Sequence, residues 1–125
     1  LNTKSQFRRL LELDGIDIAQ PDLMYSGGIT EAKKIAAIAE TFHVPISFHN
    51  TKGPIGILAA AHVIASIPNA APIEFVTGID WRDDIIDHPL HVQQGRLVLS
   101  DRPGLGVELT EAGLARHGWQ AEDPR

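Results

Sequence analysis

Three ionisable side chains, Asp22, His49 and Glu74, lie within or at the end of three short apolar runs of the sequence. We expect each run to be a β-strand, because β-branched and aromatic residues favour strands, whereas proline, glycine and asparagine nearby favour turns. Parallel strands point their C-terminal ends the same way, so spacings of 27 and 25 residues predict that all three groups share one rim. The expected strands cover residues 16–20, 44–48 and 72–76.

This trio is suited to proton transfer at carbon. An aspartate beside a histidine fixes the tautomer of the imidazole, which can then remove a proton from carbon. A glutamate across the site, if burial keeps it protonated, could donate a hydrogen bond to a developing enolate oxygen. Taken singly, each residue has a simpler interpretation, because aspartate after proline often forms a turn and a lone histidine is more often structural. Because all three residues lie at strand ends, we favour a catalytic role for them over these simpler interpretations.

Helical patterns separate these strands, over residues 4–13, 30–42 and 54–67. We expect Thr3 or Ser5 to begin the first helix, Gly15 to end it, and Thr30 to begin the second. The alternation of helix and strand predicts an α/β fold of right-handed βαβ units on a parallel sheet. The residues expected to face the core are Phe7, Leu10, Leu11 and Leu13, then Ile35, Ile38, Ala39 and Phe42, then Ile57, Leu58, Ala61, Ile64 and Ala65.

The alternation stops after Val76. We expect a polar loop over 80–84, a small hairpin around Gln94-Gly95, a final helix from Thr110 to about His117, and a loosely held tail over 119–125. The sequence therefore predicts two parts, residues 1–76 with the three strands and residues 77–125 as a C-terminal extension.

The composition excludes several classes of protein. The chain has 125 residues, 43% of them hydrophobic and 22% charged, which are ordinary values for one soluble globular domain. A net charge of -5 leaves no basic stripe, so we expect no nucleic-acid partner. Zero cysteines exclude disulfides and fit a cytoplasmic protein. The sequence shows no signal peptide and no apolar membrane span, so we expect no membrane partner.

Other candidate residues are weaker. The remaining histidines lack the spacing of metal ligands, so we expect no metal site within this sequence. We expect His62 to be a packed residue of an apolar helix. Lys52-Gly53-Pro54 lacks the order of a phosphate-binding loop. Further candidates for contacts with a substrate are Tyr25, Asn50 and Trp81. The Trp81 ring could line one side of a substrate pocket, although packing against neighbouring residues would explain a tryptophan at this position equally well.

Several motifs, taken in order, closely resemble the C-terminal half of the mandelate racemase and muconate lactonizing enzyme family, which belongs to the enolase superfamily. The likeness covers nearly the whole chain, and the His-Asn-Thr-Lys-Gly-Pro form at His49 is most similar to the acid-sugar dehydratase branch. The segments that carry it are residues 17–22, 27–36, 49–55, Ile73-Glu74 and 103–106.

The resemblance implies a fold and a set of roles. The fold would be a (β/α)7β barrel, with residues 1–76 supplying its last three strands and Asp22, His49 and Glu74 at their ends. Asp22 would orient His49, His49 would act as general base or acid, and Glu74 would bind the carboxylate end of an enediolate. In relatives a magnesium ion, held by three carboxylates on earlier strands, stabilises that intermediate.

The expected function is that of the C-terminal part of a Mg²⁺-dependent acid-sugar dehydratase, with a small sugar acid as substrate. By resemblance the metal ligands lie upstream of Leu1, so the missing N-terminal part of the same protein is an expected partner and the chain alone should be inactive. We also expect the whole protein to be a homo-oligomer. Two alternatives stay open: a racemase or cycloisomerase of the same superfamily, and a non-catalytic half-barrel that assembles with a partner chain.

Overall fold

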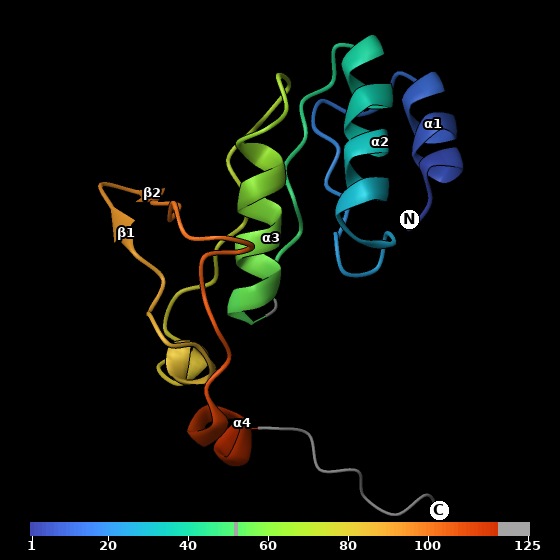
Figure 1. The fold of residues 1–125 in the computed structure, drawn as a ribbon. Coiled ribbons are helices and arrows are strands. Elements are labelled where there is room, and N and C mark those ends of the chain that lie inside the picture. Colours follow the sequence, from blue (N-terminus) through green and yellow to red (C-terminus); the bar gives the residue numbers. More distant parts are fainter. Residues whose placement is uncertain (52, 118–125) are drawn as a thin grey trace, which may run out of the picture. The chain divides into compact units, whose positions relative to one another are not determined.

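The structure is a computed structural model that describes residues 1–51 and 53–117. Two compact units make up the chain, Leu1–Gly78 and Ile79–Arg125 (Figure 1). The first unit contains three helices and three extended segments, and the second contains short helices and a hairpin.

Three extended segments of the first unit pair in parallel. Ala19 pairs with Ile46, Asp22 pairs with His49, and Ile46 also pairs with Ala70. The segment around Ile46 therefore lies between the other two. Because the pairs are single bridges rather than long ladders, these segments carry no strand label in Figure 1. Helices that alternate with parallel extended segments make this an α/β fold, as the sequence predicts.

The first segment differs from expectation at its end. The expected strand ended at Gln20, before Pro21, yet the pairing continues to Asp22. The carbonyl of Pro21 accepts a hydrogen bond from the His49 N–H at 3.0 Å. A proline removes only a donor, so its carbonyl still extends the pairing by one residue.

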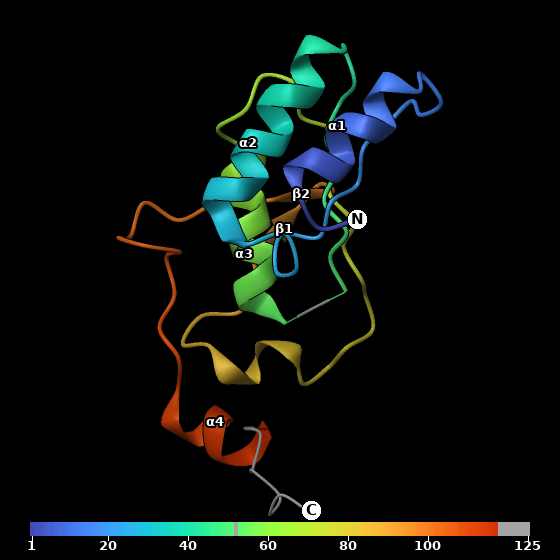
Figure 2. The same cartoon turned by 90° about the vertical axis from the view of Figure 1, so that its right-hand side faces the viewer.

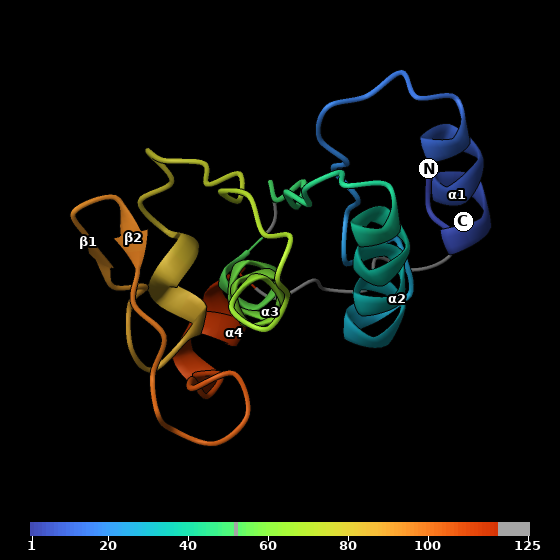
Figure 3. The ribbon, with the colours of Figure 1, turned by 90° about the horizontal axis from the view of Figure 1, so that it is seen from above.

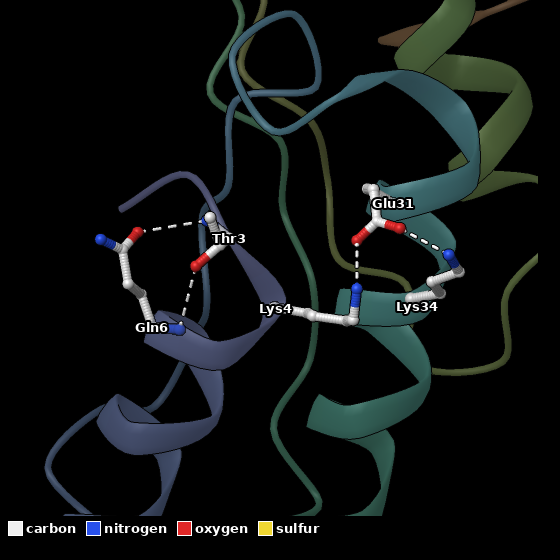
Figure 4. A network of polar contacts seen from close by, with 5 residues as sticks. All are labelled: Thr3, Lys4, Gln6, Glu31 and Lys34. Atoms are coloured by element: carbon white, nitrogen blue, oxygen red, sulfur yellow. Dashed lines mark hydrogen bonds and ion pairs between the residues drawn. The ribbon is translucent and has the colours of Figure 1, made fainter.

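Helix α1, Lys4–Glu12, begins with the capping arrangement that the sequence suggests. The Thr3 hydroxyl accepts from the Gln6 N–H, and the Gln6 side chain accepts from the Thr3 N–H (Figure 4). Phe7 and Leu11 are buried. Leu13 is 76% exposed, which contradicts its expected core position, because the helix ends before it.

The end of α1 also differs from expectation. We expected Gly15 to end the helix, but Asp14, with a φ of 50°, takes the left-handed conformation just after it. Aspartate is one of the few non-glycine residues that tolerate this conformation. Gly15 is therefore not the terminator of the helix.

Helix α2, Gly28–Thr41, begins two residues earlier than expected, so Thr30 is not its cap. Gly27 precedes it with a φ of 90°, a conformation that glycine adopts without steric cost. Ile35 and Ala39 are buried as expected, but Phe42 is 39% exposed because it lies beyond the last turn.

Helices α1 and α2 lie side by side. Glu31 at the start of α2 forms ion pairs with Lys4 of α1 and with Lys34 one turn along α2 (Figure 4). Both lysines are about half exposed, and pairs of this kind contribute little to stability. The buried apolar side chains between the two helices are the larger contribution, each worth roughly 1.5–3 kcal/mol.

Helix α3, Pro54–Ile64, is apolar on most sides, and eight of its residues are buried. Pro54 stands in the first turn, where a missing N–H costs no hydrogen bond. The helix is three residues shorter than expected, and Ala65 is exposed. Seen from above, α2 and α3 lie on one side of the extended segments (Figure 3), which places the helices over one face of the small sheet.

The second unit contains a 3-10 helix η1, Arg82–Ile85, a hairpin of β1, Val92–Gln93, with β2, Arg96–Leu97, and helix α4, Glu111–His117. Figure 2 shows η1 and α4 close together, and the Thr110 hydroxyl donates to the Asp84 carbonyl between them at 3.0 Å. The expected tail over 119–125 lies outside the described residues. No helix within the described ranges is long and apolar enough to cross a membrane.

Candidate active site

His49 and Asp22 occupy paired positions on neighbouring segments of the first unit. The Nδ1 atom of His49 lies 2.9 Å from Oδ2 of Asp22. The other carboxylate oxygen, Oδ1, accepts a hydrogen bond from the Met24 N–H at 2.9 Å. Asp22 is 9% exposed, so a nearly buried carboxylate has both of its oxygens engaged and is held in one orientation.

This contact sets the tautomer of the imidazole. An ionised carboxylate can only accept hydrogen bonds, so Nδ1 must carry the hydrogen of the neutral ring. The Nε2 atom then keeps its lone pair and is the available base. The His49 side chain is 43% exposed, so a small molecule can reach it.

Glu74 lies on the opposite side of the imidazole from Asp22. Its Oε2 atom is 3.8 Å from Nε2 of His49 and accepts a hydrogen bond from the Asn50 N–H at 2.9 Å. The glutamate side chain is 37% exposed within this structure, so these residues alone do not supply the burial that we considered for keeping it protonated. One imidazole thus stands between two carboxyl groups.

The three weaker candidates, Asn50, Tyr25 and Trp81, lie in three different surroundings. Asn50 is 3% exposed, and its Nδ2 atom has no hydrogen-bond partner among the described residues. Its backbone N–H binds Glu74, a role that the side-chain type of Asn50 does not indicate. Tyr25 is 61% exposed in the loop after Asp22. Trp81 belongs to the second unit, where its ring stacks on His117 with centroids 5.5 Å apart.

A metal ion has no visible ligand set in this part of the protein. Across residues 1–51 and 53–117, no three histidine, aspartate or glutamate side chains gather as a cation site requires. His62 is partly buried in α3, and its Nε2 atom lacks a partner within the same residues. The described residues therefore do not provide a set of ligands that fits a bound magnesium ion.

Comparison with known families explains the arrangement. A model described as enolase C-terminal domain-like matches residues 1–113. The chain belongs to this family. Its place in the enolase superfamily agrees with the motifs around Asp22, His49 and Glu74.

Among curated proteins, this enolase-family chain is 35% identical over 116 residues to D-xylonate dehydratase of Haloferax volcanii, covering 92% of the chain and 28% of that protein. It is 38% identical over 121 residues to D-galactonate dehydratase of Xanthomonas oryzae pv. oryzae, covering 91% of the chain and 32% of that protein. The chain therefore spans less than a third of the length of these two relatives.

Solved structures give the same result. A mandelate racemase/muconate lactonizing enzyme-like protein from Rubrobacter xylanophilus superposes with a TM-score of 0.86 and 35% identity, over 92% of this chain and 30% of that one. An enolase from Agrobacterium radiobacter, bound to Na and L-malate, gives a TM-score of 0.85 and 31% identity, over 100% of this chain and 36% of that one. The resemblance to this family that the motifs indicated is confirmed.

Proposed function

We propose that this chain supplies the proton-transfer residues of an acid-sugar dehydratase. The observation that carries the proposal is the 2.9 Å contact between Nδ1 of His49 and Oδ2 of Asp22, which leaves Nε2 of an accessible imidazole as a base. The substrate class follows from the curated relatives, which are named for dehydration of D-xylonate and D-galactonate. Both compounds are sugar acids that carry hydroxyl groups on the two carbons after the carboxylate.

In the proposed reaction, His49 moves one proton. Its Nε2 atom takes the hydrogen from the carbon next to the substrate carboxylate, and the electron pair of that C–H bond passes into an enediolate. The electron pair of the enediolate then forms a C=C bond to the next carbon while the bond from that carbon to its hydroxyl breaks. The hydroxyl receives a proton and leaves as water, and the enol that remains tautomerises to the 2-oxo acid. The imidazolium can return the proton it took, so His49 serves as base and then as acid.

The two carboxyl groups have separate roles in this proposal. Asp22 orients the ring and faces the imidazolium that forms after proton transfer, which stabilises that charge. Glu74 lies on the side of the ring where the substrate must approach Nε2, and we assign it to bind the carboxylate end of the enediolate. Tyr25, Asn50 and Trp81 remain proposals for contacts with the substrate.

The metal belongs to the proposal for the whole protein. Mg²⁺, when bound, would stabilise the negative charge of the enediolate. The described residues offer no ligand set for it, so no step above passes through the metal. The ligands, the remaining part of the barrel and any subunit contacts are proposed to come from other residues of the same protein.

We prefer dehydration to racemisation because the two curated relatives above are both dehydratases. The dyad itself does not choose between these outcomes, since either reaction begins with removal of the same proton. Exchange of the hydrogen next to the carboxylate therefore tests His49, and release of a 2-oxo acid tests the dehydratase proposal separately.

The test uses the intact natural gene product, whose mass is measured first. D-xylonate and D-galactonate are offered in D₂O, and both hydrogen exchange next to the carboxylate and 2-oxo acid are followed. We expect His49→Asn to abolish both signals. His43→Asn is the matched control, because His43 is exposed and has a φ of 57°, a conformation that asparagine accepts readily.

Three outcomes would contradict the proposal. Unchanged exchange in His49→Asn removes the role of this residue. Exchange without 2-oxo acid replaces dehydration by racemisation. An intact mass equal to that of 125 residues, with no complementary chain and no turnover, favours the non-catalytic half-barrel instead.

A further inference from the structure

The pairing of the three segments of the first unit contains a shift of one residue. Ile46 is paired regularly, because its N–H donates to the Asn69 carbonyl and its carbonyl accepts from the Ala71 N–H. Two residues further along, regular pairing would bring the Ile73 N–H to the Phe48 carbonyl. The group that donates there is the Glu74 N–H, at 3.3 Å. The third segment thus contains one additional residue between Ala71 and Glu74.

This additional residue decides which face Glu74 occupies. Side chains alternate between the two faces of a sheet, so a shift of one residue moves a side chain to the opposite face. Ile46 and Phe48 are fully buried, whereas His49 is on the other, more open face. Without the shift, Glu74 would follow Phe48 toward the buried side. With it, Glu74 lies level with His49, 3.8 Å from Nε2.

A hydroxyl group holds the segment at the shift. The Oγ atom of Ser47 donates a hydrogen bond to the Pro72 carbonyl at 2.8 Å. Pro72 is a residue that suits such an irregularity, because it has no N–H to contribute to regular pairing. Ser47 precedes His49 by two residues and therefore faces the same side of the sheet. Its hydroxyl is thus placed between the segment that carries His49 and the one that carries Glu74.

We infer that Ser47 is a positioning residue: its hydrogen bond to Pro72 fixes the one-residue shift that places Glu74 beside His49. The inference rests on the proposed function for its catalytic consequence, but the shift itself is a property of these residues alone. The Ser47 hydroxyl donates to the Pro72 carbonyl and not to His49 or Glu74, so it acts through the backbone between Pro72 and Glu74.

The first test measures the shift without any substrate. In Ser47→Ala, we expect the Glu74 amide hydrogen to exchange with solvent at least about tenfold faster, because loss of the anchor lets this segment open locally. The Ser47 N–H, which donates to the Ala19 carbonyl on the other side, should keep its protection. Ser66→Ala is the matched control, because its Oγ donates to a backbone carbonyl in the same way, to Val63 at 2.9 Å, at the end of α3.

The second test asks whether Ser47 acts through Glu74. In the intact natural gene product, Ser47→Ala should lower kcat for the sugar acid by about 10- to 100-fold, since small displacements of a positioned group cost that much. Ser47→Thr, which keeps the hydroxyl, should restore most of it. In a Glu74→Gln background, Ser47→Ala should have little further effect on kcat, whereas a general structural defect would reduce kcat equally in both backgrounds.

The outcomes separate the inference from the proposed function. Unchanged exchange at Glu74, or equal effects of Ser47→Ala with and without Glu74→Gln, overturns the role of Ser47. If the natural protein turns over no sugar acid, the proposed function fails, and the exchange measurement alone then decides whether Ser47 holds the shift.

Discussion

Asp22 and His49 stand at directly paired positions of two parallel segments, 2.9 Å apart through Oδ2 and Nδ1. The backbone pairing itself brings Asp22 and His49 together, so their contact does not depend on a long or flexible side chain. The second carboxylate oxygen is tied to the Met24 N–H, so the loop after Asp22 also fixes its orientation. The dyad is therefore prearranged by local structure in this part of the protein.

We predict that Asp22→Asn lowers hydrogen exchange next to the substrate carboxylate by roughly 100- to 10,000-fold in the intact natural protein. The amide can still accept from the Met24 N–H through Oδ1, but it then turns its NH₂ group toward Nδ1. That favours the tautomer with hydrogen on Nε2, which no longer offers a base there. Solvent-to-substrate deuterium exchange measures the effect.

Asp17→Asn is the control for this experiment, because Asp17 is exposed in the same segment. Near-normal activity of Asp22→Asn would show that the orientation of the imidazole does not depend on this carboxylate.

Much of this arrangement could be predicted from local sequence. The 27-residue spacing between Asp22 and His49 equals the offset between their paired segments, and Thr3, one of the two expected caps, caps α1. Helix boundaries failed where one backbone angle decides them, at Asp14 and Gly27. Such angles depend on how the chain passes between a helix and the sheet, after α1 at Asp14 and before α2 at Gly27, which composition and periodicity do not encode.

The position of Glu74 shows a second limit. Pro72 in an apolar run signals an irregular strand, but it does not say in which direction the register shifts. The hydrogen bond from Ser47 to Pro72 joins residues 25 apart in sequence, and this tertiary contact accompanies the shift. The sequence could therefore name Glu74 as a candidate without predicting that an additional residue brings it to the face of His49.

We predict that Thr3→Ala destabilises α1 by about 1 kcal/mol, because the Gln6 N–H loses its side-chain acceptor and the reciprocal contact loosens. Lys4→Ala should cost less, since it removes only a surface ion pair with Glu31. Urea unfolding of the two variants compares them. A larger loss in Lys4→Ala would mean that the ion pair, rather than the cap, fixes α1 against α2.

We predict that a side chain at Gly113 causes a steric clash in the second unit. A Cβ atom there would lie 2.2 Å from the Asp84 carbonyl oxygen and 2.6 Å from Cα of Ile85, both of them backbone atoms. Gly113→Ala should therefore destabilise the packing of α4 on η1 by about 1–3 kcal/mol, although alanine is the better helix former.

Amide exchange at Thr110, whose N–H donates to the Ile85 carbonyl at 2.9 Å, measures this opening locally. Gly15→Ala is the matched control, because the nearest atom to its added Cβ would be 3.9 Å away. Protection at Thr110 that is unchanged in Gly113→Ala would show that α4 can move away from η1 without cost.

Asp87 gives a pH-dependent prediction in the same unit. The Glu108 N–H donates to its Oδ1 at 2.8 Å, and the Arg102 guanidinium donates to its Oδ2 at 2.9 Å. These two contacts, the backbone hydrogen bond first, lower the pKa of Asp87 below its ordinary value of 3.8. A lowered pKa means that the folded state prefers the ionised carboxylate, which contributes stability above pH 3.8. That contribution is lost as the pH falls through the lowered pKa of the folded state.

We therefore predict that Asp87→Asn is less stable than the natural protein at pH 6, and that the difference shrinks as the pH falls below 3.8. The comparison is the urea midpoint of both proteins at pH 6 and at pH 3, at constant ionic strength because exposed ion pairs are screened by salt. Asp101→Asn, an exposed position of the same region, controls for the change in net charge. A difference that stays constant or grows toward pH 3 would mean that the link from Asp87 to Glu108 and Arg102 does not depend on the ionised carboxylate.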